Sequence, residues 1–144
     1  MIQLLLSFIA AYYMLVFLYY ILSVIGKWKI FVKMGEPGWF SLIPFLNDYF
    51  IFRHCWDTTA FFAMLFCSAV VLFLGPSDPA EEPSMLVNLA SMAVFVLTFL
   101  KNIKLSRSFG HGYLYAFGLM VLNPVFSIIL GFGNSRYLGN TTGY

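Results

Sequence analysis

Charged residues are scarce in this sequence, and cysteine and histidine are scarcer still. Only 10% of the 144 residues are charged and 61% are hydrophobic, whereas soluble chains carry about 25% charged and about 45–50% apolar residues. Folding in water would therefore leave a largely apolar surface. Lipid is the better solvent for this composition, and we expect a single integral membrane domain over residues 1–144.

The few cysteines and histidines argue against a disulfide within one helix and against a structural metal site. Cys55 and Cys67 are twelve residues apart, which is about 18 Å along one helix and beyond the ~7 Å limit between bridged Cα atoms. His54 and His111 add too few ligands for a zinc site. The net charge of +2 is too small to track nucleic-acid phosphates. We expect no metal, no cofactor and no nucleic-acid partner.

Four long uncharged runs predict an all-α membrane protein with four transmembrane helices. A helix needs about 20 apolar residues to cross about 30 Å of hydrocarbon, and each run approaches or exceeds that length. The first run has no Lys or Arg before it and no cleavage site after it, so we interpret it as a retained helix rather than a signal peptide. The predicted spans are residues 2–26, 57–75, 84–104 and 112–131.

The positions of Lys and Arg predict the orientation, because these residues resist transfer across the membrane. The loop between the second and third spans is acidic and has no basic residue. Placing the two basic loops in the cytoplasm leaves both termini outside, with Arg136 as the one basic residue there. The seven cytoplasmic residues would be Lys27, Lys29, Lys33, Arg53, Lys101, Lys104 and Arg107.

Residues 38–55 do not fit a plain four-span arrangement. This segment is mostly apolar although it lies in a loop that should be cytoplasmic, and its apolar part is too short to span a membrane. Pro44 would also break a helix that continued into the second span, because proline lacks an N–H and clashes with the preceding turn. We predict a short interfacial or re-entrant helix before the second span.

A weak internal repeat divides the chain into two units of two spans. Basic residues, glycines and an aromatic residue follow the first span, and the same order recurs about 74 residues later. Both units start on the same side, so the repeat would be parallel. It predicts that the fourth helix is interrupted at its proline. Chance similarity between aromatic-rich, glycine-punctuated segments is the alternative.

The clearest candidate site comes from this repeat. Pro44 with Asn47 in the first unit is echoed by Asn123 with Pro124 in the second. A proline frees a backbone carbonyl, and that carbonyl together with an amide side chain could hold a cation or a polar solute. In the alternative interpretation these residues form a kink whose polar groups satisfy one another.

Asp48, Arg53 and Asp57 form a second candidate, a charge cluster at the membrane interface. Arg53 and Asp57 have the i, i+4 spacing of an ion pair on a helix, and Asp48 could join them. His54 and Cys55 do not predict a thiol dyad, because adjacent helical residues point about 100° apart. We therefore predict no catalytic residue in this segment.

Three segments of the sequence resemble those of a known family. They are Gly35-Glu36-Pro37-Gly38-Trp39, the run from Ile43-Pro44 to Asn47, and Gly131-Phe132-Gly133 with Tyr137. Together they resemble a family of small bacterial membrane proteins of unknown activity, some of which carry the label signal peptidase I. The resemblance implies a bacterial inner-membrane protein of about four helices. A Ser-Lys hydrolase needs a nucleophile beside an activated lysine, and the Ser-Met pairs here lack the proline typical of that peptidase.

Two functional hypotheses remain. In the first, the protein is not an enzyme but a homo-oligomer that forms a channel-like or transport-like pathway, or a binding site for a small solute. In the second, it is an accessory subunit of a larger membrane complex that serves peptide export, processing or immunity. The expected partners are the lipid bilayer and either further copies of the chain or another membrane protein.

Overall fold

The computed structural model describes residues 1–78 and 80–140, and this part of the chain is helical with no strand. Uninterrupted apolar runs form the helices, while glycine, proline and short polar segments separate them. In chain order the elements are α1 (Ile2–Lys33), the 3-10 helix η1 (Gly38–Leu42), α2 (Pro44–Cys55), α3 (Thr58–Leu74), α4 (Met85–Ser108), α5 (Tyr113–Val121) and α6 (Asn123–Phe132).

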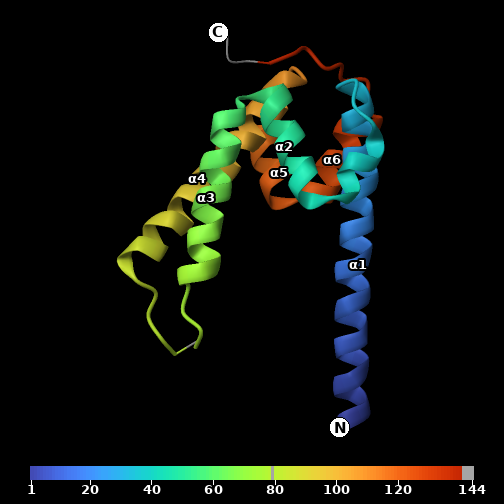
Figure 1. Cartoon of the computed structure of the whole chain (residues 1–144). Coiled ribbons are helices and arrows are strands. Elements are labelled where there is room, and N and C mark those ends of the chain that lie inside the picture. The colour runs from blue at the N-terminus through green and yellow to red at the C-terminus, as the bar shows by residue number, and fades with distance from the viewer. Residues whose placement is uncertain (79, 141–144) are drawn as a thin grey trace.

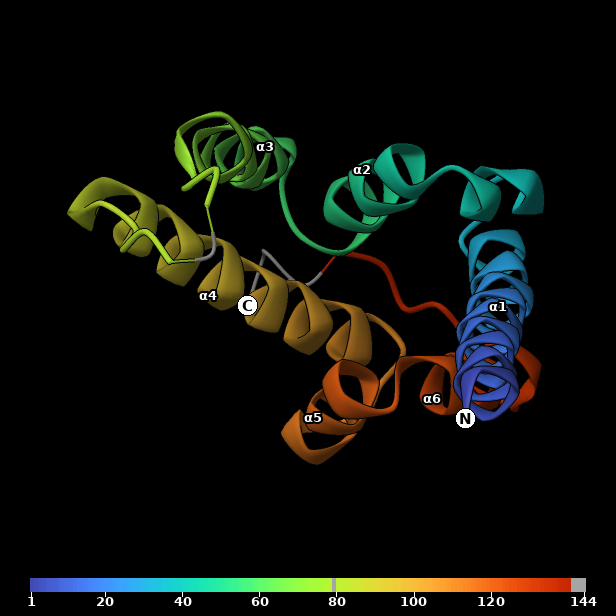
Figure 2. The same ribbon diagram turned by 90° about the horizontal axis from the view of Figure 1, so that it is seen from below.

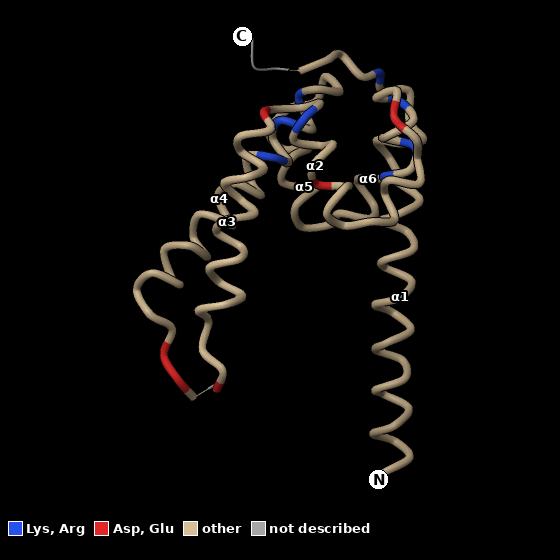
Figure 3. The backbone as a smooth tube through the Cα atoms, viewed as in Figure 1, with Lys and Arg blue, Asp and Glu red and all other residues tan. Residues whose placement is uncertain are grey.

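The elements form an arch (Figure 1). Helix α1 is one leg, the antiparallel pair α3 and α4 is the other, and η1, α2, α5 and α6 join the legs at one end. Lys and Arg gather toward this closed end, which we call the basic end (Figure 3). The opposite end, the acidic end, carries the N-terminus and the α3–α4 loop with Asp78, Glu81 and Glu82.

Helices α1 and α4 end in the same glycine cap, which supports the predicted repeat locally. Gly35 has φ 85° and Gly110 has φ 79°, a left-handed conformation that glycine adopts without steric cost. Next to each glycine, the following amide donates to a carbonyl five residues back, which closes the last turn. These bonds run from Glu36 N to Phe31 O and from His111 N to Ser106 O, each 2.9 Å long.

After the first cap the chain forms a hairpin, which we call the first hairpin (η1 and α2). Element η1 runs back along α1, and the Tyr20 hydroxyl donates to the Leu42 carbonyl at 3.0 Å. Tyr20 lies about 20 Å from the basic end of α1 at 1.5 Å per residue. Helix α2 then begins at Pro44 and returns to the basic end. The predicted segment at 38–55 is therefore two short helices, with the break before Pro44.

The predicted span at 112–131 is also a hairpin, which we call the second hairpin (α5 and α6). Its two helices have 9 and 10 residues, so each is only about 14–15 Å long and neither spans about 30 Å. The break falls at Leu122, and Pro124 occupies the first turn of α6, where its missing N–H costs nothing. The predicted interruption is present, but the prediction of one spanning helix is wrong.

The second hairpin returns the chain to the basic end. The Lys33 ammonium, at the end of α1, donates to the carbonyls of Leu130, Gly133 and Ser135 at 2.6, 2.8 and 2.9 Å. Hence the C-terminal segment lies beside the basic residues and opposite the N-terminus (Figure 1). The structure places the two ends of the described chain at opposite ends of the molecule, which differs from the prediction that both termini lie together, because the fourth predicted span turns back on itself (Figure 1).

Of the described helices, α1 and α4 are long and apolar enough to cross a membrane, while α3 is apolar but shorter. Helix α1 extends past the predicted end at residue 26 to Lys33, and α4 covers Met85–Ser108 rather than 84–104. In place of four spanning helices, the described chain thus has two long apolar helices, α1 and α4, and two shorter ones, α3 and α6.

The hydrophobic core lies at the basic end, where all the helices except α3 contribute buried side chains. It includes Ile30, Phe31, Met34, Phe50, Ile51, Cys55, Leu105, Phe109, Leu119 and Leu130. Helix α1 crosses α6 at close range, because a Cβ on Gly26 would lie 2.7 Å from the Ile128 nitrogen. Small residues allow such contact between backbones. The first half of α1, by contrast, is exposed along its whole circumference.

Candidate functional site

A polar cavity of about 380 Å³ lies between the tips of the two hairpins and the legs α1 and α4. Seen from the acidic end, α2 lies on one side, α5 and α6 lie on the other, and α1 and α4 close the two ends (Figure 2). The cavity has room for a small solute or several waters. Its polar lining residues come from all of these elements: Tyr19, Tyr20, Ser23, Lys27, Ser41, Asn47, Thr98, Lys101, Asn102 and Asn123.

Three of the four residues predicted from the repeat meet at this cavity. Pro44, Asn47 and Asn123 line it, although about 76 residues of chain separate the two asparagines. Pro124 is buried behind them in the first turn of α6. The structure thus brings the two proline breaks together, as tips of hairpins that enter from the same end.

Asn47 is the least satisfied of these side chains. Its relative exposure is 6%, yet its Oδ1 atom has no hydrogen-bond partner among the described residues. Ser23, which is 8% exposed, lines the same cavity with an unpaired Oγ. Buried polar atoms without partners are rare and costly. Two of them on one cavity wall indicate a place for a polar molecule.

The Asn123 side chain is better satisfied and fixes the tip of the second hairpin. Its Nδ2 donates to the Leu119 carbonyl at 3.1 Å, and its Oδ1 accepts from the Ser127 hydroxyl at 3.3 Å. Leu119 belongs to α5 and Ser127 to α6, so this amide bridges the break. The alternative interpretation, a kink whose polar groups satisfy one another, therefore fits Asn123. It does not fit Asn47, whose amide oxygen has no hydrogen-bond partner among the described residues.

Two lysines from the predicted loops lie in the cavity wall instead. Lys27 of α1 and Lys101 of α4 both line it. Lys101 donates to an Asp48 carboxylate oxygen at 2.7 Å, with the two side chains 13% and 33% exposed. Lys27 has no ion pair among the described residues, since the only two are Lys101–Asp48 and His54–Glu36. From the sequence, these two lysines are interpreted only as indicators of membrane orientation, and their position in the cavity wall is not predicted.

The predicted charge cluster does not assemble. Asp48 pairs with Lys101 rather than with Arg53, and Asp57 caps α3 by accepting from the Thr59 amide and hydroxyl. Hydrogen bonding from the Thr59 side chain lowers the pKa of Asp57. Helix α2 ends at Cys55, before Asp57, so Arg53 and Asp57 do not lie on one continuous helix and lack the geometry of an i, i+4 ion pair.

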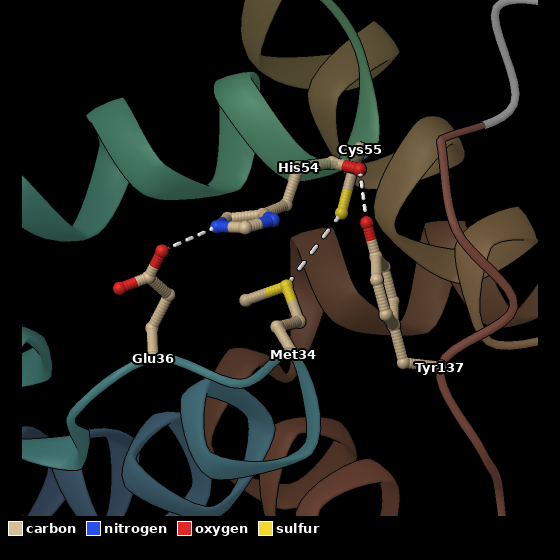
Figure 4. Close-up of polar contacts among 5 residues, drawn as sticks. All are labelled: Met34, Glu36, His54, Cys55 and Tyr137. Carbon is tan, nitrogen blue, oxygen red and sulfur yellow. Dashed lines mark hydrogen bonds and ion pairs between the residues drawn. The ribbon is translucent and has the colours of Figure 1, made fainter.

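A second group of side-chain contacts lies at the basic end and includes Met34 and Cys55 of the core (Figure 4). The His54 ring points to Glu36, with 2.9 Å between Nε2 and Oε1, while the Cys55 sulfur points to the Met34 sulfur at 4.0 Å. The Tyr137 hydroxyl donates to the His54 carbonyl. Because His54 and Cys55 face different partners, no thiol dyad forms. The group ties the turn after α1 to the end of α2.

The C-terminal segment at residues 133–140, which we call the strap, crosses this end. Besides Tyr137, it is held by the His111 ring, which lies 2.6 Å from the Ser135 hydroxyl, and by the Leu138 amide, which donates to Ser108 O at 2.7 Å. Burial raises the pKa of Tyr137 to about 12. The strap thereby holds both hairpins to the ends of α1 and α4.

No group of three or more His, Cys, Asp or Glu residues that could hold a metal occurs in the described chain. The cavity therefore has the chemistry of a binding site built from amides, hydroxyls and ammonium groups. Amides and hydroxyls both donate and accept, while the lysines only donate.

Comparison with known proteins places the chain in one family. Residues 39–140 match the Family of unknown function (DUF5684), a range that covers both hairpins except Gly38, together with α3, α4 and the strap. No curated protein sequence and no solved structure matches the chain.

Proposed function

We propose that this chain, which belongs to the Family of unknown function (DUF5684), is an integral membrane protein that binds a small polar solute. The solute occupies the cavity between the hairpins, in a channel-like or transport-like role rather than an enzymatic one. The observation that supports this most is the convergence of Pro44, Asn47 and Asn123 on one polar cavity.

The proposed topology has three crossings, by α1, α3 and α4, and two hairpins that enter from the basic end. All Lys and Arg residues lie toward that end (Figure 3), and under the positive-inside rule this supports a cytoplasmic location for it, with the protein in a bacterial inner membrane. The N-terminus is then outside and the strap is inside. Non-helical backbone at membrane depth is tolerated where it lines a cavity, and the residue that follows each break, Pro44 or Asn123, lies in the cavity wall.

A flux assay over a panel of solutes tests this function even though the solute is unidentified. The full chain is purified and reconstituted into liposomes loaded with one of a panel of small osmolytes and salts. These are mixed into an isosmotic solution of an impermeant solute, and shrinkage as the loaded solute leaves is followed by stopped-flow light scattering. We expect faster shrinkage than in protein-free liposomes for at least one solute. Asn47→Leu combined with Asn123→Leu should abolish the difference, because both changes remove polar groups from the cavity.

Asn134→Leu is the matched control, because Asn134 is exposed and absent from the cavity wall. Liposomes that contain this variant should shrink at the wild-type rate. If the double variant, reconstituted to the same level, also shrinks at the wild-type rate for every solute that crosses, the cavity is not the pathway and the proposal fails.

A second candidate function rests on the first half of α1. Its side chains are exposed on every face, for example Phe8 at 71% and Met14 at 74%, and the opposite leg does not reach it (Figure 1). A helix that lacks partners in its own chain could pack against a further copy or against a larger membrane protein, as an accessory subunit would. Capture from mild detergent that returns only the chain itself would oppose the accessory role.

A further inference from the structure

We propose that the solute held between the hairpins is an oxyanion, such as a phosphate group, and that Lys27 is its principal ligand. This inference rests on the proposed function, because it names the chemistry of the same cavity. Three observations support it: an excess of positive charge in the wall, two helix N-termini at the cavity, and buried amides without partners.

The charges in the wall do not balance. Lys27 and Lys101 both line the cavity, and the only carboxylate near them is Asp48, which already accepts from Lys101 at 2.7 Å. Two ammonium groups thus face one carboxylate. A charge withdrawn from water is costly unless it is paired, so an anion in the cavity would stabilise the Lys27 ammonium, for which the described chain supplies no ion pair.

Both hairpins add positive potential at the same place. Helix α2 begins at Pro44 and α6 begins at Asn123, and both residues line the cavity. The first amides of a helix have no internal acceptor, and the aligned peptide dipoles give this end a partial positive charge. Half-helices whose N-termini point into a membrane site are a recurrent way to hold an anionic group.

The amides supply donors without adding charge. Asn47 and Asn102 are 6% and 5% exposed and line the cavity. Neither side-chain amide donates a hydrogen bond to a described residue. Each amide offers two N–H donors to the oxygens of a bound anion. The unpaired Asn47 Oδ1 is an acceptor and requires a donor, which a protonated phosphate oxygen or a water molecule supplies. A metal cation would instead meet two ammonium groups and two helix N-termini, which disfavours it.

The test measures thermal unfolding of the full chain in neutral detergent, with sodium phosphate or with sodium chloride at equal ionic strength. A ligand that binds the folded state raises the Tm in proportion to its occupancy. A parallel series uses micelles doped with phosphatidylglycerol or with phosphatidylcholine. The variants are Lys27→Gln and, as a matched control, Lys104→Gln, which makes the same charge change outside the cavity wall.

We expect phosphate or phosphatidylglycerol to raise the Tm of the wild type and of Lys104→Gln. Lys27→Gln should bind about tenfold to a hundredfold more weakly, as expected for loss of one charge-assisted hydrogen bond. A response to phosphate identifies a free oxyanion, whereas a response to phosphatidylglycerol but not to phosphate or phosphatidylcholine identifies an anionic lipid headgroup. Without either ligand, Lys27→Gln should unfold at the same or a higher temperature, because it removes an unpaired charge.

Three outcomes would overturn the inference: no response to either anion, a response of equal size in Lys27→Gln, or a lower Tm of that variant without ligand. The last result would show that Lys27 has a structural role. None of these results bears on solute flux through the cavity, so failure here and failure of the proposed function are distinguishable.

Discussion

At the scale of single residues, the fold depends on how closely α1 approaches α6. A Cβ on Gly26 would lie 2.7 Å from the backbone nitrogen of Ile128, and a Cβ on Gly131 would lie 2.5 Å from the Gly26 carbonyl oxygen. Both obstacles are backbone atoms, which cannot rotate away as a flexible side chain could. Any side chain at either glycine therefore has to push the two helices apart.

We expect Gly26→Ala to destabilise the protein by about 1–3 kcal/mol, as overpacking of a well-packed interior does. Unfolding in mixed micelles, followed by circular dichroism, measures this. Gly112→Ala is the control, because a Cβ at Gly112 meets nothing within 4 Å. Equal stability of the two variants would show that α1 and α6 do not cross at Gly26.

Several cavity residues could be found from the sequence and others could not. Pro44, Asn47 and Asn123 stood out, together with Pro124 behind them, because a proline near an asparagine occurs in both units of the predicted repeat. Lys27 was less visible, since a lysine just past an apolar run normally marks the membrane boundary. Lys27 is four residues from Ser23, and this spacing places both side chains on one face of a helix. That shared polar face is the one feature of the sequence that could have indicated a role for Lys27 in the cavity.

At the scale of elements, hydropathy cannot distinguish one straight span from a folded one. Residues 112–131 form an uncharged run of spanning length, and the structure divides it into α5 and α6. The adjacent Asn123 and Pro124 predicted the break correctly. The reversal of direction follows from packing of α6 along α1 and from the Lys33 bonds to its end, contacts about 100 residues apart in sequence that periodicity does not reveal.

The strap gives a prediction with a definite pH dependence. Burial raises the pKa of Tyr137 from the usual 10 to about 12, so its neutral hydroxyl is favoured in the folded state. Its contribution to stability is complete below pH 10 and is lost as the pH rises through about 12. Across neutral pH the Tyr137 bond to His54 O therefore remains intact.

Two measurements on Tyr137→Phe test this. Limited proteolysis at pH 7 should cut within residues 133–140 faster in the variant than in the wild type, because one bond that holds the strap is missing. In an absorbance titration of phenolate, the component lost in the variant should titrate near pH 12. A lost component that titrates near pH 10 would show that Tyr137 is solvated.

At the scale of the whole molecule, the protein is an arch whose closed end carries the basic residues, the core, the cavity and the strap. The composition predicted a helical protein suited to lipid, and the charge distribution predicted which loops share a side. The four-span count failed because it assumed that each apolar run crosses once. In the proposed topology the two hairpins turn back, and the three remaining crossings leave the termini on opposite sides.

The position of the strap relative to the α3–α4 loop tests this arrangement most directly. In a variant with Cys55→Ala and Cys67→Ala, single cysteines are introduced at Ser77 and at Asn134, both exposed, and intact cells are treated with a membrane-impermeant maleimide. We predict labelling of Ser77→Cys in intact cells and of Asn134→Cys only after permeabilisation. Labelling of both from outside would mean that the last helical segment crosses the membrane, and the cavity between two re-entrant hairpins would not exist.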